Sequence, residues 1–167
     1  MINIGLNLSE WSSYSCKPDT KSELKDIIKR RISEQGNNCD LNDIDVSLIE
    51  DMSYLFCESK FNGDISNWDV SNVKDMEGMF YVACFDSDIS KWNTSKVEDM
   101  SCMFEYSKFN GDLSNWDVSK VKNMSAMFAC SKFNQNISNW NINKDCKITN
   151  MFKDCPIKEE YKPKPLR

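Results

Sequence analysis

The sequence repeats itself with a strict period of 24 residues, which restricts the chain to folds built by stacking copies of one unit. Phenylalanine and tryptophan each recur in one column of the repeat: Phe61, Phe85, Phe109 and Phe133, and Trp68, Trp92, Trp116 and Trp140. A Met-Phe pair ends each unit, from Met79-Phe80 to Met151-Phe152. A degenerate earlier copy keeps the same phases between Leu41 and Phe56.

Each unit contains two different local patterns. The stretch 61–70, FNGDISNWDV, alternates apolar and polar residues and predicts a short strand. The stretch 71–80, SNVKDMEGMF, places Val73, Met76, Met79 and Phe80 on one face of a helical turn. A strand and a helical turn bury their apolar sides only when copies stack. The sequence therefore predicts an α/β repeat, a solenoid of about five 24-residue rungs.

Both ends of the chain differ from the repeat. A capping box, Thr20-Lys21-Ser22-Glu23, predicts a helix that ends at Gly36 and covers the open end of the core. A partner-binding helix is the alternative interpretation. Alternating apolar residues in 1–16 predict an extra strand, and prolines predict an extended tail. We expect residues 1–36 to form an N-terminal strand and capping helix, 37–156 the repeats, and 157–167 the tail.

The repeated units resemble the BspA-like leucine-rich repeats of bacterial surface proteins. The shared motif, F-N-x-D-I-S-x-W-D-V-S-N-V-x-D-M-x-x-M-F, covers roughly residues 40–154 of this sequence. The resemblance implies a right-handed, leucine-rich-repeat-like solenoid that acts in adhesion or protein binding without catalysis.

The composition argues against an enzyme and against a nucleic-acid-binding protein. Histidine is absent, which removes the commonest general base and metal ligand, and no phosphate-binding or nucleophile motif occurs. The net charge of −5, with no strongly basic block, disfavours binding to phosphates. We expect no cofactor, no metal and no direct contact with nucleic acid or membrane.

The expected location is the cytoplasm. The N-terminus lacks the basic and apolar regions of a secretory signal, and no apolar run is long enough to span a bilayer. In a reducing compartment the eight cysteines are expected to be free thiols that pack as small hydrophobic residues. A reactive or redox role for these thiols is the alternative.

Acidic residues recur in two columns. Asp64, Asp88 and Asp112 precede Asn136 in one, while Asp69 and Asp117 alternate with asparagine in the other. The side chains of such residues can cap turns, bind calcium or contact a basic partner. The candidate partner contacts are Asp64, Asp88, Asp112, Asp69, Asp117 and Lys91. The tryptophan column is interpreted as a core ladder, with a base-stacking platform as the alternative.

The leading hypothesis is a non-enzymatic protein-binding solenoid, because a regular surface without a catalytic constellation suits protein–protein interaction. A basic nucleic-acid-binding protein is one candidate partner for its acidic surface. A narrower alternative is a mobile-element-encoded inhibitor, of the anti-defence or anti-CRISPR type, that binds a nucleic-acid enzyme. A further alternative is a fragment of a bacterial surface adhesin.

Overall fold

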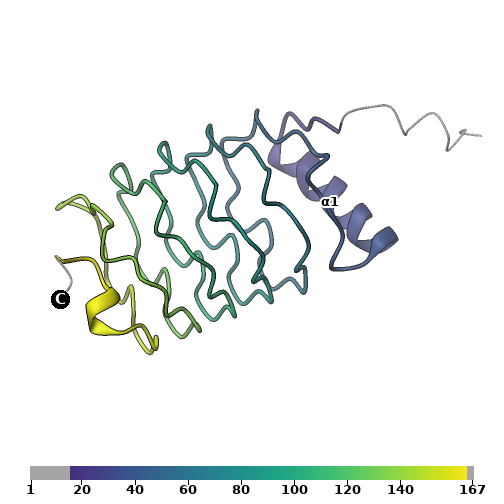
Figure 1. Cartoon of the computed structure of the whole chain (residues 1–167). Helices are drawn as coiled ribbons and strands as arrows, with labels where there is room; N and C mark the ends of the chain where they lie inside the picture. Colours follow the sequence, from purple (N-terminus) through teal and green to yellow (C-terminus); the bar gives the residue numbers. More distant parts are fainter. Residues whose placement is uncertain (1–15, 165–167) are drawn as a thin grey trace, which may run out of the picture.

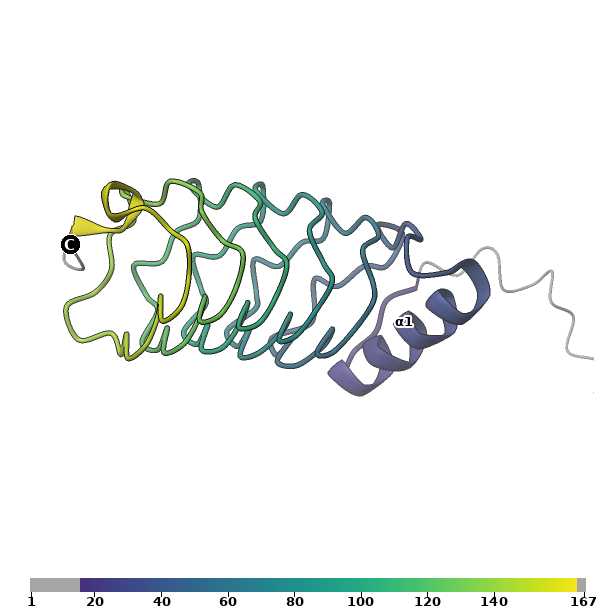
Figure 2. The same cartoon turned by 90° about the horizontal axis from the view of Figure 1, so that it is seen from below.

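Successive 24-residue segments of the chain lie parallel to one another as a row of coils (Figure 1). The computed structural model describes residues 16–164. Single parallel bridges join neighbouring coils at one corner, from Asp51 through Asp75, Asp99 and Asn123 to Lys147. Two helices flank the coils: α1 (Lys21–Gln35) at the first coil, and the 3-10 helix η2 (Glu159–Tyr161) near the other end (Figures 1 and 2).

The predicted fold class is wrong. We expected an α/β repeat, a right-handed leucine-rich-repeat-like solenoid of about five rungs with an N-terminal capping helix. Residues 16–164 instead contain one α-helix, no strand and no sheet, and the coils are joined only by isolated bridges and loop hydrogen bonds.

Backbone conformation explains why the predicted elements of each unit do not form. In the stretch predicted as a helical turn, 71–80, Gly78 has a φ angle of 55°, and Val82 just after it has one of 53°. Such left-handed residues interrupt an α-helix, so the segment forms successive turns. The stretch predicted as a strand, 61–70, has a single bridge, at Asp64. The chain turns a corner there, and this prevents a longer ladder from forming.

The helix predicted after Thr20 is confirmed as α1. The Thr20 hydroxyl accepts a hydrogen bond from the Glu23 amide at 3.3 Å, and the Glu23 carboxylate accepts one from the Asp19 amide at 3.1 Å. Gly36, with a φ of 87°, ends the helix. Three apolar residues on one side, Leu24, Ile27 and Ile28, are buried in the core.

Columns of stacked aromatic rings form the centre of the coils. The four tryptophans of the repeat are 3–4% exposed, and the rings of Trp68, Trp92 and Trp116 lie 6.3–6.5 Å apart. Each indole N–H donates to a backbone carbonyl 27 residues earlier, such as Trp92 to Ile65 at 3.1 Å. These contacts confirm the interpretation of the tryptophans as a core ladder.

The cysteines and the chain ends complete the description. All eight cysteines are free thiols; Cys39 and Cys146 are buried and the other six are half-buried. The strand predicted over 1–16 falls outside the described residues except for Cys16. The tail predicted as extended over 157–167 contains the 3-10 helix η2, and its residues beyond 164 are not described. Within the described part of the chain, no helix has the length and apolar character needed to cross a membrane.

Candidate functional site

Each coil turns at corners that an aspartate or asparagine side chain stabilises. Asp64, Asp88 and Asp112, three of the predicted partner contacts, occupy one corner in successive coils and are exposed. In each, Oδ1 accepts a hydrogen bond at 2.8–2.9 Å from the backbone N–H two residues further on. This geometry confirms the turn-capping interpretation of the column.

The second acidic column has the same arrangement at another corner. Asp69 and Asp117 are exposed and accept the N–H two residues on at 3.1 and 3.0 Å. Asn93 occupies the same corner in the intervening coil and accepts at 3.2 Å. Because asparagine serves as well as aspartate, the corner requires a side-chain oxygen and no charge.

Lys91 lies beside the first column. Hydrogen bonds from the Ser90 amide and hydroxyl lower the pKa of Asp88, and the positive charge of Lys91 lowers it further. The six predicted residues therefore lie exposed on two separate corners of the coils.

Three other columns, beside the Met-Phe pair, hold a different residue type in each of the first four coils. We call their members in the first four coils the variable face. They are Tyr54, Cys57 and Glu58; Gly78, Tyr81 and Val82; Cys102, Glu105 and Tyr106; and Ala126, Ala129 and Cys130.

The backbone beneath the variable face is held by a ladder of hydrogen bonds. Tyr54 N–H donates to the Glu77 carbonyl at 2.8 Å, Phe56 to Met79 at 2.9 Å, and the same pairing recurs between later coils. Two of its three columns have left-handed φ angles throughout, including 53° at Val82. A β-branched residue is rare in that region, and such strain often marks functional positions.

Large apolar side chains are exposed on this ladder. Tyr54, Val82 and Tyr106 are 41%, 43% and 53% exposed. The Tyr54 hydroxyl donates to the Glu77 carboxylate at 2.6 Å, which fixes its ring across the next coil. The rings of Tyr81 and Tyr106 meet edge to face with centroids 6.2 Å apart. The variable face is therefore a rigid surface with aromatic and aliphatic groups available for contact.

Two thiols on this face, those of Cys57 and Cys102, have raised pKa values and are therefore neutral at physiological pH. Burial, a hydrogen bond with Glu105 and the negative charges of Glu105, Glu77 and Asp99 raise the pKa of Cys102 to about 12. Burial and the charge of Glu58 likewise raise the pKa of Cys57. Since the thiolate is the nucleophilic form, these two side chains provide apolar contact area here.

Reasoning from the columns that repeat does not identify the variable face. Repeating columns serve packing and turns that every coil shares. A column that is needed neither for packing nor for a turn can vary. Variation between units is therefore the sequence signal that marks the variable face. It could not be used without knowing that most of these positions reach the surface, Gly78 and Ala129 being buried.

A family model matches residues 24–129 and 81–161 of the chain, which together include the whole variable face and all six predicted contact residues. No curated protein and no solved structure matches the chain significantly. The two matched segments span most of the sequence, and the chain therefore belongs to the family described as "Mycoplasma protein of unknown function, DUF285".

Proposed function

We propose that the protein is a non-enzymatic binding module that contacts a partner protein through the variable face. One observation carries the proposal: side chains that differ in every one of the first four coils are displayed on a rigid backbone ladder, with Tyr54, Val82 and Tyr106 strongly exposed. Exposed aromatic groups on a preorganised surface lose little conformational freedom on binding, which favours association.

The charges on this face indicate the chemistry of the partner. The variable face contains Glu58 and Glu105 and no lysine or arginine, and Glu77 lies beside it. A partner surface with an apolar centre and basic residues around it would complement this arrangement. The resemblance to BspA-like repeats supports a binding role, and the eight free thiols favour a location in the reducing cytoplasm.

The narrower hypotheses differ only in the identity of the partner. An inhibitor of a nucleic-acid enzyme would capture such an enzyme, and would do so better after nuclease treatment removes competing nucleic acid. An adhesin fragment would instead capture envelope or host-surface proteins.

The test is affinity capture from lysates, with and without nuclease, comparing the natural chain with two variants. The first variant combines Val82→Asn and Tyr106→Asn, because asparagine tolerates left-handed backbone and therefore preserves the fold. We expect it to lose at least about tenfold in affinity for the captured partner, as removal of central contact residues does.

The second variant separates the variable face from the acidic corners. It combines Asp64→Asn, Asp88→Asn and Asp112→Asn; Asn136 already occupies this corner, so the turns are retained. We expect this variant to bind the partner with the same affinity as the natural chain. The proposal would be refuted if this variant lost both its binding and the salt dependence of that binding while the Val82 and Tyr106 variant still bound. That result would place the contact on the acidic corners.

A further inference from the structure

The hydrogen-bond ladder beneath the Met-Phe pairs runs in one direction only. Between the last two coils, four N–H groups of one coil donate to four carbonyls of the next at 2.7–2.9 Å. The pairs are Met124 to Lys147, Ala126 to Thr149, Phe128 to Met151, and Cys130 to Lys153. A ladder of this kind must end in unpaired donors at one end of the row and unpaired acceptors at the other.

The unpaired donors lie on the last coil. The backbone N–H groups of Ile148, Asn150, Phe152 and Asp154 continue the donor series, and none of them has an acceptor among residues 16–164. We call these four groups the donor edge. The C-terminal segment makes its backbone hydrogen bond elsewhere on this coil, where Ile137 N–H donates to the Tyr161 carbonyl at 3.0 Å, and Lys162 Nζ lies 5.8 Å from the centroid of the Phe152 ring.

The unpaired acceptors lie on the first coil, where α1 packs. The carbonyls of Asp51, Ser53, Leu55 and Cys57 continue the acceptor series, and none of them receives a hydrogen bond from a described residue. Three lysines spaced four residues apart on α1 lie beside them: Lys21, Lys25 and Lys29.

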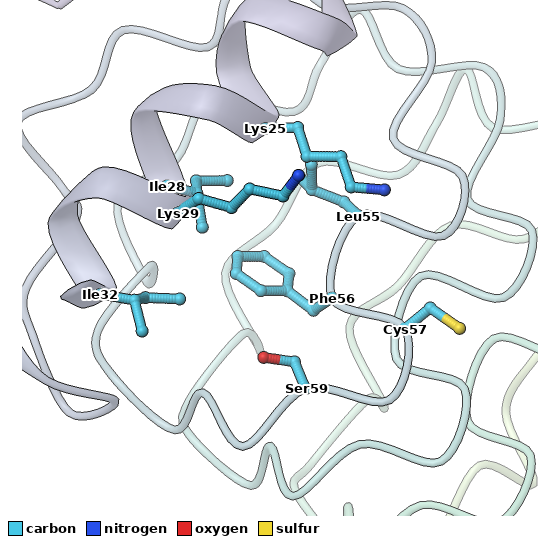
Figure 3. A pocket seen from close by; sticks show the side chains of 8 residues that line it. All are labelled: Lys25, Ile28, Lys29, Ile32, Leu55, Phe56, Cys57 and Ser59. Atoms are coloured by element: carbon cyan, nitrogen blue, oxygen red, sulfur yellow. The ribbon is translucent and has the colours of Figure 1, made fainter.

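Contacts show how these lysines are placed. Lys21 Nζ donates to the Asp51 carboxylate at 2.9 Å and to the Ser53 hydroxyl. Lys25 and Lys29 line a cavity of about 190 Å³ together with Leu55 and Cys57 (Figure 3). A helix with an apolar side and regularly spaced cations thus covers the edge that presents only acceptors.

We propose that the donor edge binds an acidic helical segment of a partner protein, with one apolar side and carboxylates at four-residue spacing. The carbonyls of Thr149, Met151 and Lys153 between these donors already accept from the preceding coil, and the Cys146 carbonyl adjoins the edge at one end. Four such donors are matched by groups that only accept, and carboxylates are such groups. An ordinary strand edge offers N–H groups together with carbonyls and does not match.

The surroundings of the edge support this choice. Ile148 and Phe152 are half-buried, whereas Phe128 in the preceding coil is fully buried. Lys147 and Lys153 are exposed on the same segment, and residues 144–164 contain six lysines against four acidic residues. Apolar area flanked by positive charge suits a segment that is apolar on one side and acidic on the other.

A second copy of this chain is a poorer occupant. Two last coils placed against each other would oppose donors to donors. A last coil placed against a first coil would meet α1, whose residues Leu24, Ile27 and Ile28 are buried in the core.

The first measurement is amide hydrogen exchange on the free protein. The N–H groups of Asn150 and Phe152 should exchange at least about tenfold faster than those of Ala126 and Phe128, which donate one coil earlier. Equal protection at both places would show that the edge is already covered and would overturn the proposal.

The second measurement uses a peptide of residues 19–36 with Lys21→Glu, Lys25→Glu and Lys29→Glu, which keeps the apolar side of α1. It should bind the full chain at least about tenfold more tightly than the unchanged peptide, more weakly at high salt, and should slow exchange at the donor edge. Equal binding of the two peptides, or no binding by the acidic one, would overturn the proposal.

Matched variants locate the binding. Lys147→Glu with Lys153→Glu should weaken peptide binding about tenfold, while Lys108→Glu with Lys120→Glu, exposed lysines of earlier coils, should leave it unchanged. The Val82 and Tyr106 variant should bind the acidic peptide normally. The proposals for the donor edge and for the variable face can therefore be refuted independently of each other.

Discussion

Truncation of one central tryptophan gives a quantitative test of the aromatic ladder. Trp92 is 3% exposed, and its ring lies between those of Trp68 at 6.5 Å and Trp116 at 6.3 Å. Its indole N–H donates to the Ile65 carbonyl at 3.1 Å. Trp92→Ala removes the ring, these two stacking contacts, a third with Phe80 at 6.4 Å, and this hydrogen bond at once.

The expected loss follows from these contacts. A buried aromatic residue truncated to alanine costs about 3–5 kcal/mol through lost apolar contact and the cavity left behind. The Ile65 carbonyl still accepts the Trp68 amide at 3.2 Å, so it is not left without a partner and no full desolvation penalty is added. We therefore expect a loss of about 4 kcal/mol, and a melting temperature lower by roughly 10 °C.

Urea unfolding followed by circular dichroism measures this loss. Lys91→Ala is the matched control, because Lys91 adjoins Trp92 in sequence but is exposed, and it should change stability by less than about 0.5 kcal/mol. Trp92→Phe, which keeps a ring and loses the donor, should fall between the two. Equal losses from Trp92→Ala and Lys91→Ala would refute the account of the core.

Three further substitutions test a corner and the close approach of neighbouring coils. Burial, together with the charges of Asp51 and Asp99, raises the pKa of Asp75 above its ordinary 3.8, so the charged form costs stability at neutral pH and this cost vanishes as the pH falls through that raised pKa. Asp75→Asn should therefore stabilise the fold by up to about 1 kcal/mol near neutral pH and lose this advantage in acid, as denaturant titrations at several pH values will show; an equal advantage in acid would contradict this reasoning. Gly63→Ala should lower the melting temperature because its Cβ would overlap the Cys39 carbonyl oxygen, whereas Gly111→Ala meets only the edge of the Phe109 ring and should cost less. If the two alanine variants lower the melting temperature equally, the close approach of the first two coils at Gly63 is not the cause of the loss.

Some features could be predicted because they depend on local sequence. The capping box at Thr20 and the glycine at position 36 delimit α1, since a helix end is set by hydrogen bonds within a few residues. Tryptophan recurring with the period of the unit indicated burial, because the same environment recurs in every coil.

The internal conformation of the unit could not be predicted in this way. Val73, Met76, Met79 and Phe80 have the spacing of a helical face, yet they belong to a run of turns that includes the left-handed Gly78. A helix would satisfy its backbone within the segment, whereas here alternate N–H groups, those of Met76, Gly78 and Phe80, donate to carbonyls of the next coil. Apolar spacing alone does not distinguish the two, since both arrangements bury the same side chains.

The sequence by itself determined the 24-residue unit, the position of α1 and the residues of the core, because identical local patterns have identical local requirements. Only the tertiary structure decided that Val82 and Tyr106 reach the surface and that the last coil ends in unpaired donors. Each of these depends on which backbone groups lie opposite one another in neighbouring coils, and that pairing is made between residues about 24 positions apart.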